Sequence, residues 1–289
     1  MMREREAIII CLKGGLGNQM FQYALYYKFK KLGKNVFLDL SLYRSKIEKR
    51  KYELGIFRNI VFDEATENEC QCMRGSYKNV IDIILRKFDL KKYYYREREG
   101  KFIGEIYDKN RIYLDGYWQN EKYFKDIRQD LLLQFQFPPL QHMENINVAK
   151  AIQETNSVSV HVRRGDYLNN KKTYGCLYQT DYYRNAIKYI CDRIENAVFF
   201  VFSDDTVWCK DHLKIPNCHI IDWNNKEESY WDMCLMTYCK HNIIANSSFS
   251  WWGAWLNTNP ERIVIAPGKW INDDRVQVSD IIPSDWICV

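Results

Sequence analysis

The sequence predicts an α/β protein whose strands form parallel sheets. Short apolar runs alternate with longer segments of helical periodicity, and glycine-rich or small polar turns separate them. Parallel strands are buried on both faces and are therefore expected as such apolar runs. With 289 residues, 46% hydrophobic and 27% charged, the chain is long enough for one large or two modest domains.

The N-terminal half begins with a βαβ pattern. Its expected strands are at residues 7–12, 35–40 and 111–115. Its expected helices run to Leu32, with Gly33 closing the first, and then near 63–73, near 77–88 and over 121–135, with Asn120 as the cap of the last.

The C-terminal half alternates more regularly. Pro138-Pro139 interrupts the chain, and we place here a boundary between domains of residues 1–140 and 141–289. The expected strands are at 158–162, 197–202, 219–222, 242–245 and 262–266. The expected helices are at 181–194, 205–212, 230–240 and 249–256.

Composition excludes several functional classes. The net charge of +5 permits an anionic ligand or a weak attraction to an acidic membrane surface, but it is too small to indicate nucleic acid. The 10 cysteines are scattered as in a reduced protein, and Cys70-Gln71-Cys72 lacks zinc-ligand spacing, so we expect no metal site. We expect neither a signal peptide nor a membrane span, hence a cytoplasmic protein; peripheral attachment at the inner face of the membrane stays open.

The strand over 158–162 ends in charge. Its valines alternate with polar residues, so His161 is expected on a polar face that points toward a ligand. Arg163, Arg164 and Asp166 follow at the carboxyl end, where ligands bind in open α/β sheets. Guanidinium groups suit phosphate oxygens, and Asp166 is expected to brace one of them. The alternative is an ion-paired strand end without a ligand.

The residues of the glycine-rich turn after the first strand allow two interpretations. Gly15 and Gly17 imitate a dinucleotide fingerprint, with Asp39 about twenty residues on, but Met20 occupies the position of the third glycine. The other interpretation is a tight turn without chemistry.

A strand also runs into a helix through small polar residues near residue 246. This turn consists of Asn246, Ser247, Ser248, Phe249 and Ser250. Free backbone amides and the positive end of the helix dipole predict an anion site here. In the preceding helix, Ser229 and Asp232 fit a capping box, and the buried stripe is expected to be Trp231, Leu235, Tyr238 and Cys239.

Four motifs occur in family order, at residues 14–24, 116–124, 158–167 and 232–256. Together they resemble glycosyltransferase family 11, the α-1,2-fucosyltransferases, over nearly the whole chain. The resemblance implies the GT-B architecture, two Rossmann-like halves with a cleft between them. It implies inverting transfer of L-fucose from GDP-β-L-fucose to the 2-hydroxyl of a terminal β-galactoside, on a glycan or a surface polysaccharide precursor. It implies neither metal nor cofactor, since GDP-fucose is a co-substrate.

The same resemblance implies roles for residues. The N-terminal domain would face the acceptor and the C-terminal domain would bind GDP-fucose. Arg163 would grip the β-phosphate with Arg164 beside it, His161 would lie near the nucleoside, and Asp232 would pair with guanine. The pyrophosphate loop would comprise Ser247, Ser248 and Phe249, with Asn246 and Ser250 flanking it.

The resemblance to the α-1,6-fucosyltransferases supplies no catalytic base for the acceptor in this chain. The α-1,6-fucosyltransferases place a glutamate where this chain has Lys171. Asp166 lies beside two arginines, which lower the pKa of a carboxyl and make it a poor base. Asn18, in the loop with Gly15, Gly17 and Gln19, matches an asparagine at the reaction centre of protein O-fucosyltransferases, and we expect it to position the acceptor.

Two other functional classes stay open. The arginines and tryptophans suit a non-catalytic glycan-binding or polyanion-binding module, and the incomplete fingerprint suits an NAD-dependent oxidoreductase.

Overall fold

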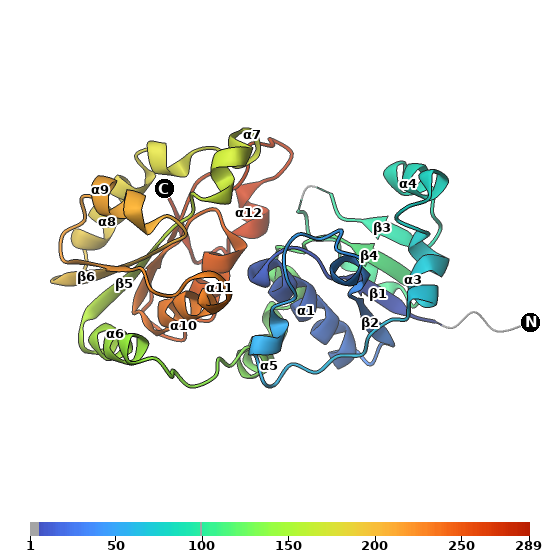
Figure 1. The fold of residues 1–289 in the computed structure, drawn as a ribbon, viewed down its shortest axis with the longest axis horizontal. Helices are drawn as coiled ribbons and strands as arrows, with labels where there is room; N and C mark the ends of the chain where they lie inside the picture. The colour runs from blue at the N-terminus through green and yellow to red at the C-terminus, as the bar shows by residue number, and fades with distance from the viewer. Residues whose placement is uncertain (1–5, 99) are drawn as a thin grey trace, which may run out of the picture. The chain divides into compact units, whose positions relative to one another are not determined.

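The computed structural model describes residues 6–98 and 100–289 and divides the chain into two compact units. Unit 1 is Met1–Pro138 and unit 2 is Pro139–Val289. Each unit has its own sheet, in which every recorded pairing is parallel, with helices packed against it (Figure 1). The predicted α/β class, with two Rossmann-like halves as in GT-B proteins, is confirmed.

The sheet of unit 1 has the strand order β2-β1-β4-β3. Its strands are β1 (Ile8–Cys11), β2 (Val36–Asp39), β3 (Tyr94–Arg96) and β4 (Ile112–Asp115). The central strand β1 is buried along its whole length because it pairs on both edges. The sequence analysis did not predict β3, which is only three residues long.

The helices of unit 1 are shorter than predicted, except for the first. They are α1 (Leu16–Lys31), α2 (Ser41–Arg44), α3 (Glu67–Arg74), α4 (Val80–Lys87) and α5 (Arg128–Gln134). The prediction of one helix over 121–135 is wrong: Asn120 caps a 3-10 turn, Glu121–Tyr123, and α5 begins only at Arg128. Phe124 interrupts the helix with a φ of −149°, and its fully buried ring lies 5.9 Å from that of Phe21. Burial of this ring accompanies the break in the helix.

The sheet of unit 2 has the order β10-β9-β8-β5-β6-β7. Its strands are β5 (Asn156–Val162), β6 (Ala197–Ser203), β7 (Cys218–Ile221), β8 (His241–Ile243), β9 (Val264–Ala266) and β10 (Ile287–Cys288). Its helices are α6 (Met143–Glu154), α7 (Lys171–Tyr174), α8 (Tyr182–Cys191), α9 (Thr206–His212), α10 (Tyr230–Tyr238), α11 (Ser248–Trp255) and α12 (Val278–Ile281).

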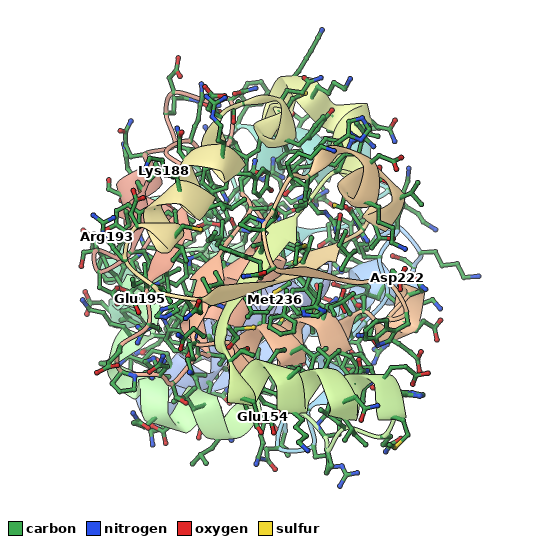
Figure 2. All side chains as sticks on the ribbon, turned by 90° about the vertical axis from the view of Figure 1, so that its left-hand side faces the viewer. Glu154, Lys188, Arg193, Glu195, Asp222 and Met236 are labelled. Atoms are coloured by element: carbon green, nitrogen blue, oxygen red, sulfur yellow. The ribbon has the colours of Figure 1, made fainter. Side chains whose placement is uncertain are left out.

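Both faces of this sheet are covered. On one face the valines of β5 pack with Ala186 and Ile190 of α8. On the other, Phe200 and Phe202 of β6 pack with α6 and with Met236 of α10. Figure 2 shows Met236 between the ribbon that carries Lys188, in α8, and the one that ends at Glu154, in α6. The sequence analysis did not predict α6.

Three polar residues of β5 are buried within unit 2. Ser157, Ser159 and His161 are at most 4% exposed. Ser159 Oγ accepts a hydrogen bond of 2.7 Å from Asn242 Nδ2 on the neighbouring strand. Helix α6 packs against this strand, and the two serines find hydrogen-bond partners in neighbouring segments. In α10, the prediction that Tyr238 belongs to the buried stripe is wrong, since this residue is 39% exposed.

Candidate active site

Three loops of unit 2 leave the carboxyl ends of β8, β5 and β6, which are neighbours in the sheet. They begin near Asn246, Arg163 and Asp204 respectively. Because parallel strands end at the same edge, this order brings together residues up to 80 positions apart in the chain.

The two arginines are held by aspartates from the end of β6. Arg163 Nη1 lies 3.2 Å from Asp204 Oδ2, and the Arg164 backbone N–H donates to Asp204 Oδ1 at 2.9 Å. Arg164 Nη1 forms an ion pair with Asp205. Both arginine side chains keep about a fifth of their surface exposed, 20% and 21%. Each guanidinium is therefore oriented by an aspartate, and each arginine side chain is partly exposed.

Asp166 was predicted to brace one of these arginines, but its side chain lies outside the described part of the chain. Asp204 and Asp205 are bracing residues that the sequence analysis missed, because they follow a different strand about 40 positions along the chain. Asp205 also caps α9, accepting from the Trp208 N–H at 3.1 Å. Gly165 permits the close approach, since a Cβ there would lie 2.7 Å from Asp204 Oδ2.

Two stacked tyrosines, Tyr167 and Tyr174, connect the loop after β5, which carries Arg163 and Arg164 (the arginine loop), to the turn after β8. The Arg163 guanidinium lies 5.6 Å from the ring centre of Tyr167, and Tyr167 stacks on Tyr174 at 4.0 Å. The Tyr167 hydroxyl donates to the Asn246 carbonyl at 2.9 Å. The arginine loop and the predicted anion loop are therefore mechanically linked.

The turn from β8 into α11 carries a helix cap on Ser247. Ser247 Oγ accepts from the Phe249 N–H at 3.4 Å. The Asn246 amide donates to the carbonyls of Tyr174 and Trp270 at 3.0 and 2.9 Å, and Ser250 is buried. Ser248 and Phe249 are the partly exposed members of this turn. A ligand contact by any of the five stays a prediction.

Two buried polar groups nearby are unusual. His161 Nδ1 has no hydrogen-bond partner within residues 6–98 and 100–289, and the ring lies 5.6 Å from that of Phe249. Burial, and then the charge of Arg163, lower the pKa of His161 to about 3, so the imidazole is neutral. A neutral imidazole nitrogen can donate or accept a hydrogen bond, so a buried Nδ1 without a partner is an unusual feature.

Asp232 is the second such group. Its Oδ1 accepts from Asn224 Nδ2 at 2.9 Å, and the side chain of Ser229 makes no cap, so the capping-box interpretation is wrong. Burial raises the pKa of the Asp232 carboxyl to about 8, while the Asn224 hydrogen bond opposes the rise. Asn224 is held in turn by Asn145 of α6, at 2.8 and 2.9 Å. The sequence analysis missed both asparagines.

The glycine-rich turn of unit 1 is occupied by its own neighbours. The buried Gln19 amide donates to the carbonyls of Gly14 and Lys51 at 2.9 and 2.8 Å. The N–H groups of Gly14 and Leu16 donate to the carboxylates of Glu48 and Glu53, each at 2.9 Å. These N–H groups are unavailable to a pyrophosphate, which argues against the dinucleotide interpretation.

Asn18 lies on the same turn and is half-buried. Its Oδ1 accepts from Gln119 Nε2 at 2.7 Å, so the first two sequence motifs meet at the carboxyl edge of this sheet. Lys13 Nζ lies 2.5 Å from Asp115 Oδ1 at this edge and 4.8 Å from the ring centre of Tyr117. The structure thus brings together an amide pair, a lysine and an aromatic ring.

Comparison with known proteins decides the family. A family model described as Glycosyl transferase family 11 matches residues 1–289. The chain belongs to glycosyltransferase family 11. This confirms the resemblance of the four motifs and makes the protein a glycosyltransferase by class.

Family 11 relatives match over most of this chain. An Escherichia coli alpha-1,2-colitosyltransferase is 35% identical, over 97% of this chain and 98% of its own. The Escherichia coli O-antigen biosynthesis glycosyltransferase WbnK is 37% identical, over 96% and 98%. The Bos taurus galactoside 2-alpha-L-fucosyltransferase SEC1 is 24% identical, over 84% and 62%.

Among solved structures, the chain is similar to the NodZ alpha-1,6-fucosyltransferase soaked with GDP-fucose, with a TM-score of 0.47 and 14% identity over 88% of this chain and 93% of that one. No helix within residues 6–98 and 100–289 combines the length and the apolar character needed to cross a bilayer.

Proposed function

We propose that this family 11 glycosyltransferase transfers L-fucose from GDP-β-L-fucose to the 2-hydroxyl of a terminal β-galactoside, with inversion to an α linkage. The observation that carries the proposal is the Arg163 guanidinium, oriented by Asp204 at 3.2 Å and still one-fifth exposed at the end of β5. A preorganised cation at a strand end is suited to a diphosphate leaving group.

In this mechanism Arg163 binds the β-phosphate of the donor. Negative charge builds on that phosphate as the bond to fucose breaks, and a guanidinium already fixed by an aspartate stabilises it without reorganising. The partly exposed Ser248 at the start of α11 offers a second set of donors, since the first N–H groups of a helix attract anions.

We assign to Asp232 the recognition of the guanine ring of the nucleotide. A carboxylate accepts the two N–H donors that guanine presents side by side, an arrangement that adenine lacks. Asn224 and Asn145 hold Asp232 in place by hydrogen bonds of 2.8 to 2.9 Å. Guanine binding would need the ionised carboxylate, so it would compete with the proton that burial favours.

We assign to Asn18 the positioning of the acceptor sugar. The amide pair of Asn18 and Gln119 provides donors and acceptors for a sugar hydroxyl without providing a base. We propose that the hydroxyl proton is lost late and moves to the departing phosphate. The reaction needs neither metal nor cofactor in this scheme, because arginine and helix N–H groups supply the positive charge.

A second donor is also considered, because one relative at 35% identity is a colitosyltransferase. The proposed phosphate and base contacts do not distinguish fucose from colitose. The sugar would be selected by other residues of the site.

The test is a transfer assay with purified protein, using GDP-fucose and the corresponding colitose nucleotide across a panel of β-galactosides, with NMR assignment of the product linkage. We expect an α-1,2-fucosyl product and competition by GDP but not ADP. Transfer of colitose alone would overturn the donor and leave the family intact. Glycan binding with an intact donor would indicate a binding module, and NADH binding without GDP binding would indicate the oxidoreductase alternative.

A further inference from the structure

Helix α4 (Val80–Lys87) exposes the residues that a helix of a globular unit normally buries. Val80 and Ile81 are 68% and 67% exposed, and Phe88 and Leu90, directly after the helix, are 63% and 67% exposed. Ile83 and Ile84 are also exposed. We call the following set the α4 patch: Val80, Ile81, Ile83, Ile84, Phe88 and Leu90. Such a cluster marks an interaction surface, since single exposed apolar residues are ordinary but contiguous ones are not.

The side of α4 that faces unit 1 is polar instead. Arg86 is 4% exposed, and its Nη1 donates to the carbonyls of Arg74 and Ser76 at 2.7 and 3.1 Å. Asp82 accepts from the Ser76 N–H at 2.8 Å and pairs with Lys91 at 2.6 Å. The helix is thus attached to its unit by polar contacts. Its apolar face is left for something other than the core of unit 1.

The charge around the α4 patch indicates what that partner is. Without the buried Arg86, residues 77–92 contain four lysines and two acidic side chains, a net charge of +2, while the whole chain carries +5. Both acidic residues are paired, Asp82 with Lys91 and Asp89 with Arg98, each at 2.6 Å. Lys78, Lys87 and Lys92 are exposed beside the apolar residues. An apolar face rimmed by lysines is complementary to an anionic lipid surface.

We propose that the α4 patch docks unit 1 onto an anionic bilayer, with α4 lying in the plane of the headgroups. Figure 1 shows α4 at the periphery of unit 1, near β3, and its apolar side chains are exposed. The apolar side chains enter the boundary between headgroups and acyl chains, and the three lysines contact lipid phosphates. The chain thereby attaches to a membrane without crossing it, and this attachment does not depend on the sugar nucleotide that the enzyme uses.

The test is sedimentation of the full chain with vesicles of phosphatidylcholine alone and of phosphatidylcholine mixed with phosphatidylglycerol, at low and high salt. We expect binding to the mixed vesicles and weaker binding at high salt. The double variant Ile81→Glu/Ile84→Glu should lower partitioning about tenfold or more, because two inserted apolar side chains are replaced by like charges facing anionic lipid. The triple variant Lys78→Glu/Lys87→Glu/Lys92→Glu should abolish the preference for phosphatidylglycerol.

The matched control is Leu133→Glu/Val207→Glu, which changes two residues that are 65% and 70% exposed and lie outside the α4 patch. It should sediment with vesicles as the wild type does, and all variants should keep the wild-type melting temperature. Absence of vesicle binding would overturn the proposal, as would equal binding by wild type and both α4 variants. Self-association without lipid binding, lost in Ile81→Glu/Ile84→Glu, would also overturn it and would make a second copy of the chain the occupant.

Discussion

The carboxyl edges of the two sheets differ in how their polar groups are used. In unit 1 the glycine-rich turn donates the N–H groups of Gly14 and Leu16 to Glu48 and Glu53, and the Gln19 amide donates to the Gly14 carbonyl. In unit 2 the arginines are oriented by aspartates yet stay partly exposed, and His161 Nδ1 has no partner within residues 6–98 and 100–289. The first edge is largely satisfied by its own unit, whereas the second has capacity left for a ligand.

This difference teaches that a glycine-rich turn is a weak indicator of nucleotide binding. The turn of unit 1 has the right position after a strand, but the carboxylates of Glu48 and Glu53 already occupy its amides. The turn from β8 into α11 in unit 2 does not match a nucleotide-binding fingerprint. Nevertheless, a partly exposed, positively charged arginine lies at the end of the adjacent strand β5.

Arg163→Ala should lower turnover about a hundredfold or more, since loss of one preorganised donor to developing charge costs roughly 3 kcal/mol. Arg163→Lys should recover little, because an ammonium lacks the bidentate geometry. The measurement is steady-state kinetics with GDP-fucose. The matched control is Arg262→Ala, which removes another partly exposed, ion-paired arginine (22%) of unit 2. Equal activity of Arg163→Ala and the control would mean that the unit 2 edge does not bind the leaving group.

Asn18→Ala should lower turnover about a hundredfold while leaving GDP affinity almost unchanged, because a positioning hydrogen bond acts on the acceptor and not on the nucleotide. Calorimetry gives the affinity, and transfer kinetics give the turnover. Gln119→Ala should show the same pattern at smaller size, since Gln119 orients Asn18 at 2.7 Å.

The result that would contradict the role of Asn18 is that Asp166 acts as a base on the acceptor hydroxyl. If Asn18→Ala is nearly wild type while Asp166→Asn keeps GDP affinity, loses turnover and removes the acidic limb of the pH–rate profile, Asp166 is the base. The role assigned to unit 1 would then be wrong.

Asp232→Asn should weaken GDP about tenfold and remove a pH dependence. In the wild type the free carboxyl has a pKa of about 8, so GDP affinity should rise as the pH increases from 6 toward 8, whereas the variant should show less of this rise. ADP serves as the control nucleotide. An identical pH dependence in wild type and variant would remove Asp232 from base recognition.

The same carboxyl makes a prediction for stability without ligand. Its folded pKa is raised from 3.8 to about 8, so the folded state keeps a proton that the unfolded state releases. Its contribution to the free energy of unfolding is therefore full below about pH 4 and is lost as the pH rises toward 8. The difference between wild type and Asp232→Asn in urea unfolding should follow this sign.

Excess EDTA should leave the rate of transfer unchanged. The physical reason is that Arg163 and the start of α11 already carry the charge compensation assigned to this edge. Transfer assays with and without EDTA, before and after dialysis, measure it. Complete loss restored by manganese or magnesium would show that the unit 2 edge needs a further cation.

By itself, the sequence determined what depends on local pattern. The apolar runs of β1 and β6 and the small polar turn before α11 are contiguous features, so periodicity and turn chemistry predicted the α/β class and most elements. The four motifs are contiguous as well, and the family match confirmed their resemblance to glycosyltransferase family 11. Short or interrupted elements, such as β3, escaped because a few residues carry little periodicity.

Only the tertiary structure decided which distant residues meet. Asp204 reaches Arg163, Asn145 holds Asn224, and Gln119 binds Asn18, across 41, 79 and 101 positions of the chain. Strand order and helix packing set these contacts, and neither is encoded in the spacing of a single motif. The same holds for α4, whose apolar residues read as an ordinary core helix until the buried Arg86 shows which face is inside.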